Sequence, residues 1–134
     1  MNTTKTPIRS FNDLIVYRNS YDAMLKVMKE ILPLLPIEEK YDLASQLRRS
    51  SKAIPRLIAE GYAKRHQKAG FQKYLDDAMA ESNETVVSLH QCKDLYQIVP
   101  DLIDQLITTY DVTGRQLYRL AEKWAAFKLD KKQS

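Results

Sequence analysis

Residues 44–61 read ASQLRRSSKAIPRLIAEG, and this stretch decides the fold. Its apolar and small residues recur at alternating steps of three and four, at Ala44, Leu47, Ser51, Ile54, Ile58 and Gly61. Such steps keep the residues on one face of an α-helix, as packing within a bundle requires. Because Pro55 removes a backbone hydrogen bond, we expect this second helix to be kinked or broken there.

Three other segments carry the same spacing. The first predicts a buried stripe of Phe11, Leu14, Arg18, Tyr21, Leu25, Met28 and Leu32. The next predicts one of Phe71, Leu75, Ala78, Ser82, Thr85, Leu89, Cys92 and Tyr96. The last predicts one of Ile103, Leu106, Tyr110, Thr113, Leu117, Leu120, Trp124 and Phe127. Because short connections make successive helices antiparallel neighbours, we predict an all-α, up-down-up-down four-helix bundle.

A chain of 134 residues suffices for one domain. We predict a flexible N-terminal segment (1–10), the bundle (11–128) and a flexible C-terminal tail (129–134). No apolar run approaches the roughly 18 residues that span a bilayer, and the first ten residues lack the apolar part of a signal peptide. A single cysteine, Cys92, fits a reducing compartment. These features favour a cytoplasmic protein without a membrane partner.

Some residues do not suit a simple apolar core. Polar positions fall on the stripes at Arg18, Ser51, Ser82, Thr85 and Thr113. Either they form a hydrogen-bonded layer, or Arg18 extends to the surface and the hydroxyls bond their own helices. A second apolar set lies off the stripes: Ile15, Val16, Val27, Leu102, Ile107 and Tyr118. This set predicts either an oligomer interface or a wider core.

The sequence lacks the residue patterns that catalytic and metal sites use. His66 and His90 are far apart, and neither Glu81 nor Glu84 is followed by a histidine three residues later, as a di-iron bundle site requires. There is no Cys-x-x-Cys pair, glycine-rich phosphate loop or nucleophile elbow. We therefore expect no enzymatic activity, no metal and no cofactor.

Charge is distributed unevenly along a chain whose net charge is +4. Residues 48–73 hold eight cations and one acid, Glu60, whereas residues 76–111 hold eight acids and one lysine. The cations are candidate nucleic-acid contacts: Arg48, Arg49, Lys52, Arg56, Lys64, Arg65, Lys68 and Lys73. Alternatively, the charges pair within the fold, and the candidate structural pairs involve Arg49, Glu60 and Glu84.

The chain resembles a known family in several short motifs. Gln46-Leu47-Arg48-Arg49, Ile54-Pro55 and Ile58-Ala59-Glu60-Gly61 are similar to the signature of four-helix bundle proteins associated with 23S ribosomal RNA intervening sequences. Phe11, Asp13, Leu14, Val16 and Tyr17 resemble the family's opening Phe-x-Asp-Leu-x-Val-Trp, and Phe71, Leu75, Ala78 and Glu84 fit its third helix. Departures include Arg56-Leu57 in place of Ser-Asn, and Asp77, Glu81 and Thr85 in the third helix.

The resemblance implies a homo-oligomeric bundle, a pentameric ring. A relative by fold is the accessory protein of diversity-generating retroelements, a basic pentamer that binds nucleic acid and a reverse transcriptase. We therefore expect a non-enzymatic oligomer that associates with RNA or other nucleic acid, including DNA, through its basic second helix and the following loop. The alternative is a protein-interaction scaffold or accessory subunit, for example to a reverse transcriptase, without direct nucleic-acid binding.

Overall fold

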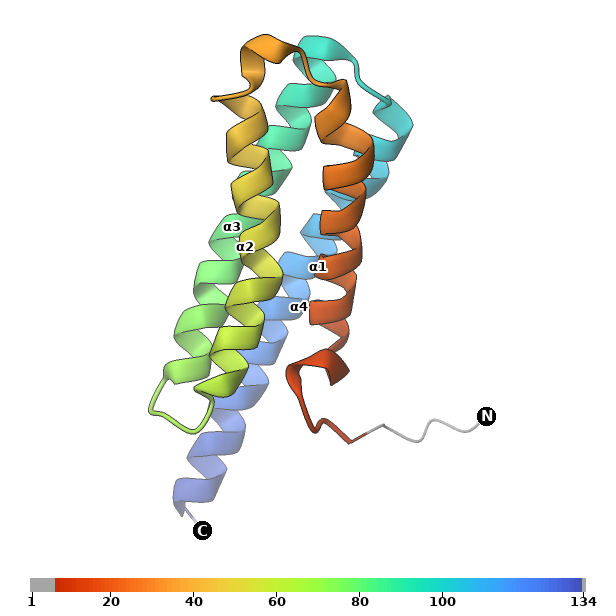
Figure 1. The fold of residues 1–134 in the computed structure, drawn as a ribbon. Helices are drawn as coiled ribbons and strands as arrows, with labels where there is room; N and C mark the ends of the chain where they lie inside the picture. The colour runs from red at the N-terminus through yellow and green to blue at the C-terminus, as the bar shows by residue number, and fades with distance from the viewer. Residues whose placement is uncertain (1–6, 134) are drawn as a thin grey trace, which may run out of the picture.

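The computed structural model describes the backbone of residues 7–133 and the side chains of residues 7–126. Within that part, four α-helices pack side by side: α1 (Ile15–Lys26), α2 (Leu43–Ala63), α3 (Gly70–Tyr96) and α4 (Pro100–Gln133). Figure 1 shows the α1–α2 and α3–α4 connections at one end of the bundle and the α2–α3 loop at the other. The predicted all-α four-helix bundle is confirmed.

Short helical turns join and flank the four helices. A 3₁₀ turn, Phe11–Asp13, precedes α1, and a π-helical turn, Val27–Ile31, prolongs it. Two more 3₁₀ turns, Leu32–Leu34 and Ile37–Glu39, form the α1–α2 connection, where prolines prevent one continuous helix. Helix α4 includes the backbone of most of the predicted C-terminal tail; the flexibility of that tail and of residues 1–10 stays a prediction.

Helix α2 continues without interruption through Pro55. The alternative that proline breaks the helix is therefore wrong, while a kink stays a prediction. The whole predicted stripe of this helix is buried, from Ala44 to Gly61. At Gly61 an added Cβ would lie 2.6 Å from the Cβ of Tyr74 on α3. Glycine at this position therefore allows α2 to lie close to Tyr74 of α3.

The predicted stripe of the first helix is wrong in its middle part. Arg18 and Tyr21 are exposed, and the buried positions of α1 and its π turn are Val16, Ser20, Ala23, Val27 and Ile31. The reason is local: Leu14 is extended (φ −77°, ψ 123°), so the helix begins only at Ile15. A spacing counted from Phe11 through Leu14 therefore loses its helical phase.

The residues of the second apolar set differ in how deeply they are buried. Val16 and Val27 belong to the core, which corrects their exclusion from the main stripe. Leu102 and Ile107 are half-buried against the core, whereas Ile15 and Tyr118 are exposed.

The stripes of α3 and α4 largely form the core, as predicted. Tyr96 is the exception on α3: it lies at the end of the helix, and its hydroxyl donates a hydrogen bond to Glu39 in the α1–α2 connection. On α4 the residues from Ile103 to Leu117 on the stripe are buried, and Leu120 and Trp124 are half-buried. The side chain of Phe127 lies outside the described residues.

The buried hydroxyls bond mainly to their own helices. Ser51, Ser82 and Thr113 donate to backbone carbonyls three or four residues earlier. Thr85 also bonds its own helix at Glu81, but its Oγ1 lies 2.8 Å from the Ser50 Oγ of α2. The structure therefore agrees with the interpretation in which the hydroxyls bond their own helices, and it adds one hydrogen bond between α2 and α3.

Replacing Gly61 with alanine should destabilise the bundle by about 1–3 kcal/mol, because the new methyl group collides with Tyr74. Gly114 on α4 is the matched control, since an added Cβ there meets nothing within 4 Å. Gly114→Ala should stabilise the protein by about 0.5–1 kcal/mol through helix propensity. Urea unfolding measures both changes, and a neutral Gly61→Ala would refute the tight α2–α3 contact.

Replacing Thr85 with valine should cost about 1 kcal/mol, because the bond to Ser50 is lost at a buried site. Ser82→Ala should cost less, since the Ser82 hydroxyl bonds only within α3 among the described contacts. Chemical denaturation compares the two variants with the parent. A more stable Thr85→Val variant would show that the cross-helix bond is not needed.

Candidate nucleic-acid interface

Three cations form a row along the exposed side of α2. Arg48, Lys52 and Arg56 follow one another at i, i+4 and i+8, about 6 Å apart along the helix axis. All three line one shallow hollow on the surface, and Glu60 and Glu81 also reach its edge. Among the described residues, none of the three forms an ion pair or side-chain hydrogen bond. We call these three residues the α2 ridge.

Arg49 is held by α3. Its Nη1 donates to Glu81 Oε2 at 2.8 Å, and its Nη2 donates to Glu84 Oε1 at 2.6 Å. These two carboxylates raise the pKa of Arg49, and the Arg49 hydrogen bond lowers the pKa of Glu84 below its ordinary value of 4.5. The structure thus brings Arg49 and Glu84 together and adds Glu81. Among the described residues, Glu60 makes no ion pair.

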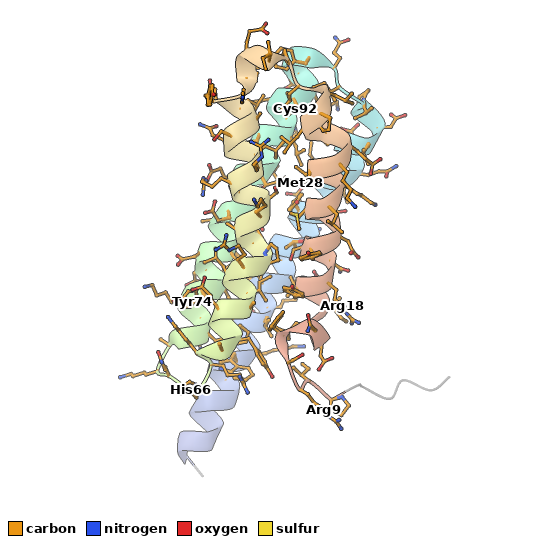
Figure 2. The ribbon with its side chains drawn as sticks, viewed as in Figure 1. Arg9, Arg18, Met28, His66, Tyr74 and Cys92 are labelled. Atoms are coloured by element: carbon orange, nitrogen blue, oxygen red, sulfur yellow. The ribbon has the colours of Figure 1, made fainter. Side chains whose placement is uncertain are left out.

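Two cations at the α2–α3 loop contact aromatic rings of the fold. Lys64 Nζ donates to the Tyr74 hydroxyl at 2.7 Å, which raises the pKa of the lysine. The Arg65 guanidinium lies 4.0 Å from the centroid of the Tyr62 ring and donates to the Tyr62 carbonyl at 2.8 Å. Figure 2 shows Tyr74 and His66 at this end of the bundle.

The remaining two candidates, Lys68 and Lys73, are exposed at the same end. Among the described residues, neither forms an ion pair. The eight sequence candidates therefore fall into three groups. Five are exposed and have no side-chain partner within the described part of the chain, two contact aromatic rings, and Arg49 joins two helices.

An aromatic hollow lies between α1 and α2, next to the α2 ridge. Its lining consists of Phe11, Tyr17, Tyr21, Met24, Lys52, Pro55, Arg56 and Ala59. Lys52 and Arg56 line both this hollow and the one along the ridge. Sequence reasoning missed the aromatic hollow because it assigned Phe11 and Tyr21 to the core. The available signal was the i, i+4 spacing of the aromatic residues Tyr17 and Tyr21.

The opposite end of the bundle has a different character. Exposed apolar side chains gather at the two connections there: Leu34, Ile37, Tyr41 and Leu95. Tyr96 and Glu39 join these connections, and the hydrogen bond to Glu39 raises the pKa of Tyr96 to about 12. Lys93 pairs with Asp104 at 2.7 Å. This end therefore carries exposed apolar side chains, whereas the α2–α3 end carries exposed cations.

The groups with chemical reactivity lie apart from these surfaces. Burial raises the pKa of Cys92 to about 11, so the thiol stays protonated at neutral pH. Within the described residues, no three His, Cys, Asp or Glu side chains are placed to hold a metal ion. In the same part of the chain, no helix is long and apolar enough to cross a membrane.

Comparison with known families gives a match over most of the chain. A family model described as "23S rRNA-intervening sequence protein" matches residues 12–119, which is more than half of the chain. The comparison with curated proteins gives no match. The matched range includes α1, α2, α3 and more than half of α4.

The ion pairs of Arg49 with Glu81 and Glu84 should make the stability of the protein depend on pH. The pKa of Glu84 is lowered in the folded state, so its stabilising effect is present above the ordinary value of 4.5 and is lost as pH falls through the lowered pKa. Glu84→Gln should therefore lose less stability than the parent between about pH 6 and about pH 3. Urea midpoints at both pH values measure this difference.

Asp77→Asn removes an exposed acid of the same helix that forms no ion pair among the described residues, and serves as the control. It should follow the pH dependence of the parent more closely than Glu84→Gln does. If Glu84→Gln and the parent lose stability equally on acidification, the Arg49 pair contributes nothing in solution.

Proposed function

We propose that this chain, which belongs to the family of 23S rRNA-intervening sequence proteins, is a non-enzymatic protein that associates with RNA through the α2 ridge. The observation that carries the proposal is the row of Arg48, Lys52 and Arg56, three exposed cations without an ion-pair partner among the described residues. Unpaired cations at regular spacing attract a polyanion without first having to break an internal ion pair.

The α2–α3 loop extends this basic surface. Lys68 and Lys73 are exposed beyond the end of α2, and Lys64 keeps an exposed ammonium group although it contacts Tyr74. Arg49 is a weaker candidate than the sequence suggested, because an RNA phosphate would compete with Glu81 and Glu84 for its guanidinium. Contacts of this kind recognise phosphate rather than sequence, so we expect binding that weakens steeply with salt.

The absence of enzymatic activity is part of the proposal. Strongly altered pKa values often mark active sites. Here the altered pKa values of Cys92 and Tyr110 follow from burial of both side chains in the core, away from solvent. The altered values of Arg49 and Tyr96 follow from hydrogen bonds that join helices or their connections.

Self-association is also proposed. The family resemblance implies a homo-oligomer, and a pentameric ring is the state we propose for this chain. The exposed apolar residues near the α1–α2 and α3–α4 connections support an interface. Burying Leu34, Ile37 and Leu95 against another protein surface would remove apolar surface from water, which is energetically favourable. We propose a cytoplasmic location on the basis of the unpaired cysteine.

The same apolar end favours a second candidate function. A protein-interaction scaffold, or an accessory subunit of a nucleic-acid enzyme such as a reverse transcriptase, would bind its partner through Leu34, Ile37 and Tyr41. Such a protein would use its positive charge for contacts between subunits. Light scattering after size-exclusion chromatography distinguishes the two functions. In the scaffold, salt changes the oligomer size; in the RNA-binding protein, salt releases the RNA and leaves the oligomer intact.

Exchanging Arg48, Lys52 and Arg56 for glutamate should reduce the affinity for a structured RNA fragment at least tenfold. The slope of log affinity against log salt should also shrink by roughly two to three, because three phosphate contacts are lost. Fluorescence anisotropy across a salt series measures both quantities.

The control exchanges Lys26, Lys29 and Lys40, which are exposed lysines outside the basic surface, for glutamate. It changes the net charge equally and should leave the salt slope nearly unchanged. Equal loss in both variants would show that net charge alone drives the binding, and unchanged binding in the ridge variant would remove α2 from the interface.

A further inference from the structure

Building on the proposed function, we infer that the aromatic hollow between α1 and α2 receives an unpaired base of single-stranded nucleic acid, while Lys52 and Arg56 hold the adjoining phosphates. The α2 ridge accounts for contacts with phosphates. The hollow adds a place for the base, and so assigns single-stranded rather than fully paired nucleic acid as the preferred ligand.

The rings of the hollow are held in place by one another. The Phe11 and Tyr17 rings meet edge to face, with centroids 4.8 Å apart and planes at 72°. The Tyr17 and Tyr21 centroids are 5.9 Å apart with planes at 35°. Tyr17 is therefore fixed between two rings, while Tyr21, at 42% exposure, keeps a side open to a ligand. A partly exposed ring next to a fixed one is suited to stacking.

The other walls are apolar. Met24 comes from α1, and Pro55 and Ala59 come from α2, so apolar side chains adjoin the rings. Pro55 contributes a rigid ring, and the small side chain of Ala59 leaves space beside it. A planar base replaces water against such walls more favourably than an extended polar chain does.

The two cations beside the hollow indicate which kind of ligand it binds. Lys52 and Arg56 stand between the apolar hollow and the surface of the ridge, because each lines both. An uncharged apolar peptide would leave these cations without a partner. A nucleotide instead places an apolar ring and an anionic phosphate next to each other, as the hollow places aromatic rings and cations next to each other.

The hollow favours single strands because a base in a duplex is already stacked and paired. RNA-binding proteins generally recognise bases that are unstacked in loops, bulges and ends, and aromatic side chains take the place of the neighbouring base. Stacking on a ring tolerates any base, since every base has an aromatic face. The inferred preference is therefore for single-stranded structure and not for a sequence.

The test compares a single-stranded oligoribonucleotide with an abasic oligonucleotide of the same length and charge. By fluorescence anisotropy, the parent protein should bind the strand with bases about tenfold more tightly. Tyr21→Ala should remove most of this difference and leave the salt-dependent binding of the abasic strand unchanged. Tyr21→Phe should keep the difference, because the ring and not the hydroxyl stacks.

Two further variants complete the set. Tyr41→Ala is the matched control, because Tyr41 is an exposed tyrosine beside a lysine at the opposite end of the bundle, and it should leave the preference intact. Ala59→Leu fills the hollow without removing a ring and should lower the preference. Circular dichroism verifies that each variant keeps the helical content of the parent.

The outcomes separate this inference from the proposed function. Equal affinity for both strands, with no effect of Tyr21→Ala, overturns the base-binding hollow and leaves phosphate binding by the α2 ridge intact. Failure to bind either strand at low salt overturns the proposed function together with the inference. Binding of an acidic peptide that competes with the oligonucleotide for the hollow, at equal or higher affinity, would assign the site to a protein partner instead.

Discussion

Helices α2 and α3 approach each other closely because small side chains line their contact. Gly61 faces Tyr74 where no Cβ fits, and the hydroxyls of Ser50 and Thr85 meet in the middle of the contact. At the edge of the same contact, Arg49 reaches across to two carboxylates of α3. This contact fixes which face of α2 is buried, and therefore which cations of α2 remain available to a ligand.

The availability of charge follows from that orientation. While Arg49 is paired with α3, its neighbours Arg48 and Lys52 are exposed and form no ion pair among the described residues. Helix α1 then packs along the other side of α2 and places its aromatic rings beside Lys52. Figure 1 shows α1 and α2 joined at the same end of the bundle, and Lys52 and Arg56 line both the ridge hollow and the aromatic hollow. A basic ridge and an aromatic hollow thus become neighbours through helix packing alone.

How much the sequence predicts depends on whether a segment is one regular helix. The stripes of α2, α3 and most of α4 could be read directly, because their spacing runs unbroken. The stripe of α1 could not, because the extended residue Leu14 interrupts the helical phase. The buried face of α1 also includes Ser20 and Ala23, and a search for large apolar residues passes over them.

The candidate site likewise has features that local spacing predicts and features that depend on how the helices pack. The i, i+4 spacing of Arg48, Lys52 and Arg56 is a local property, so the sequence contains it. The pairing of Arg49 with Glu81 depends on the register of α2 against α3, which no local pattern specifies. The aromatic hollow depends on the rotation of α1, and so it could not be found while Tyr21 was assigned to the core.

The central claim is that nucleic acid binds on the face shared by α1 and α2. Ultraviolet crosslinking to a single-stranded RNA, followed by mass spectrometry, maps the contacted residues directly. Our account predicts crosslinks at Tyr21 and at Lys52, with none at Tyr41 on the apolar end. Crosslinks concentrated at Tyr41 and the α3–α4 connection, with α2 unmodified, would contradict it.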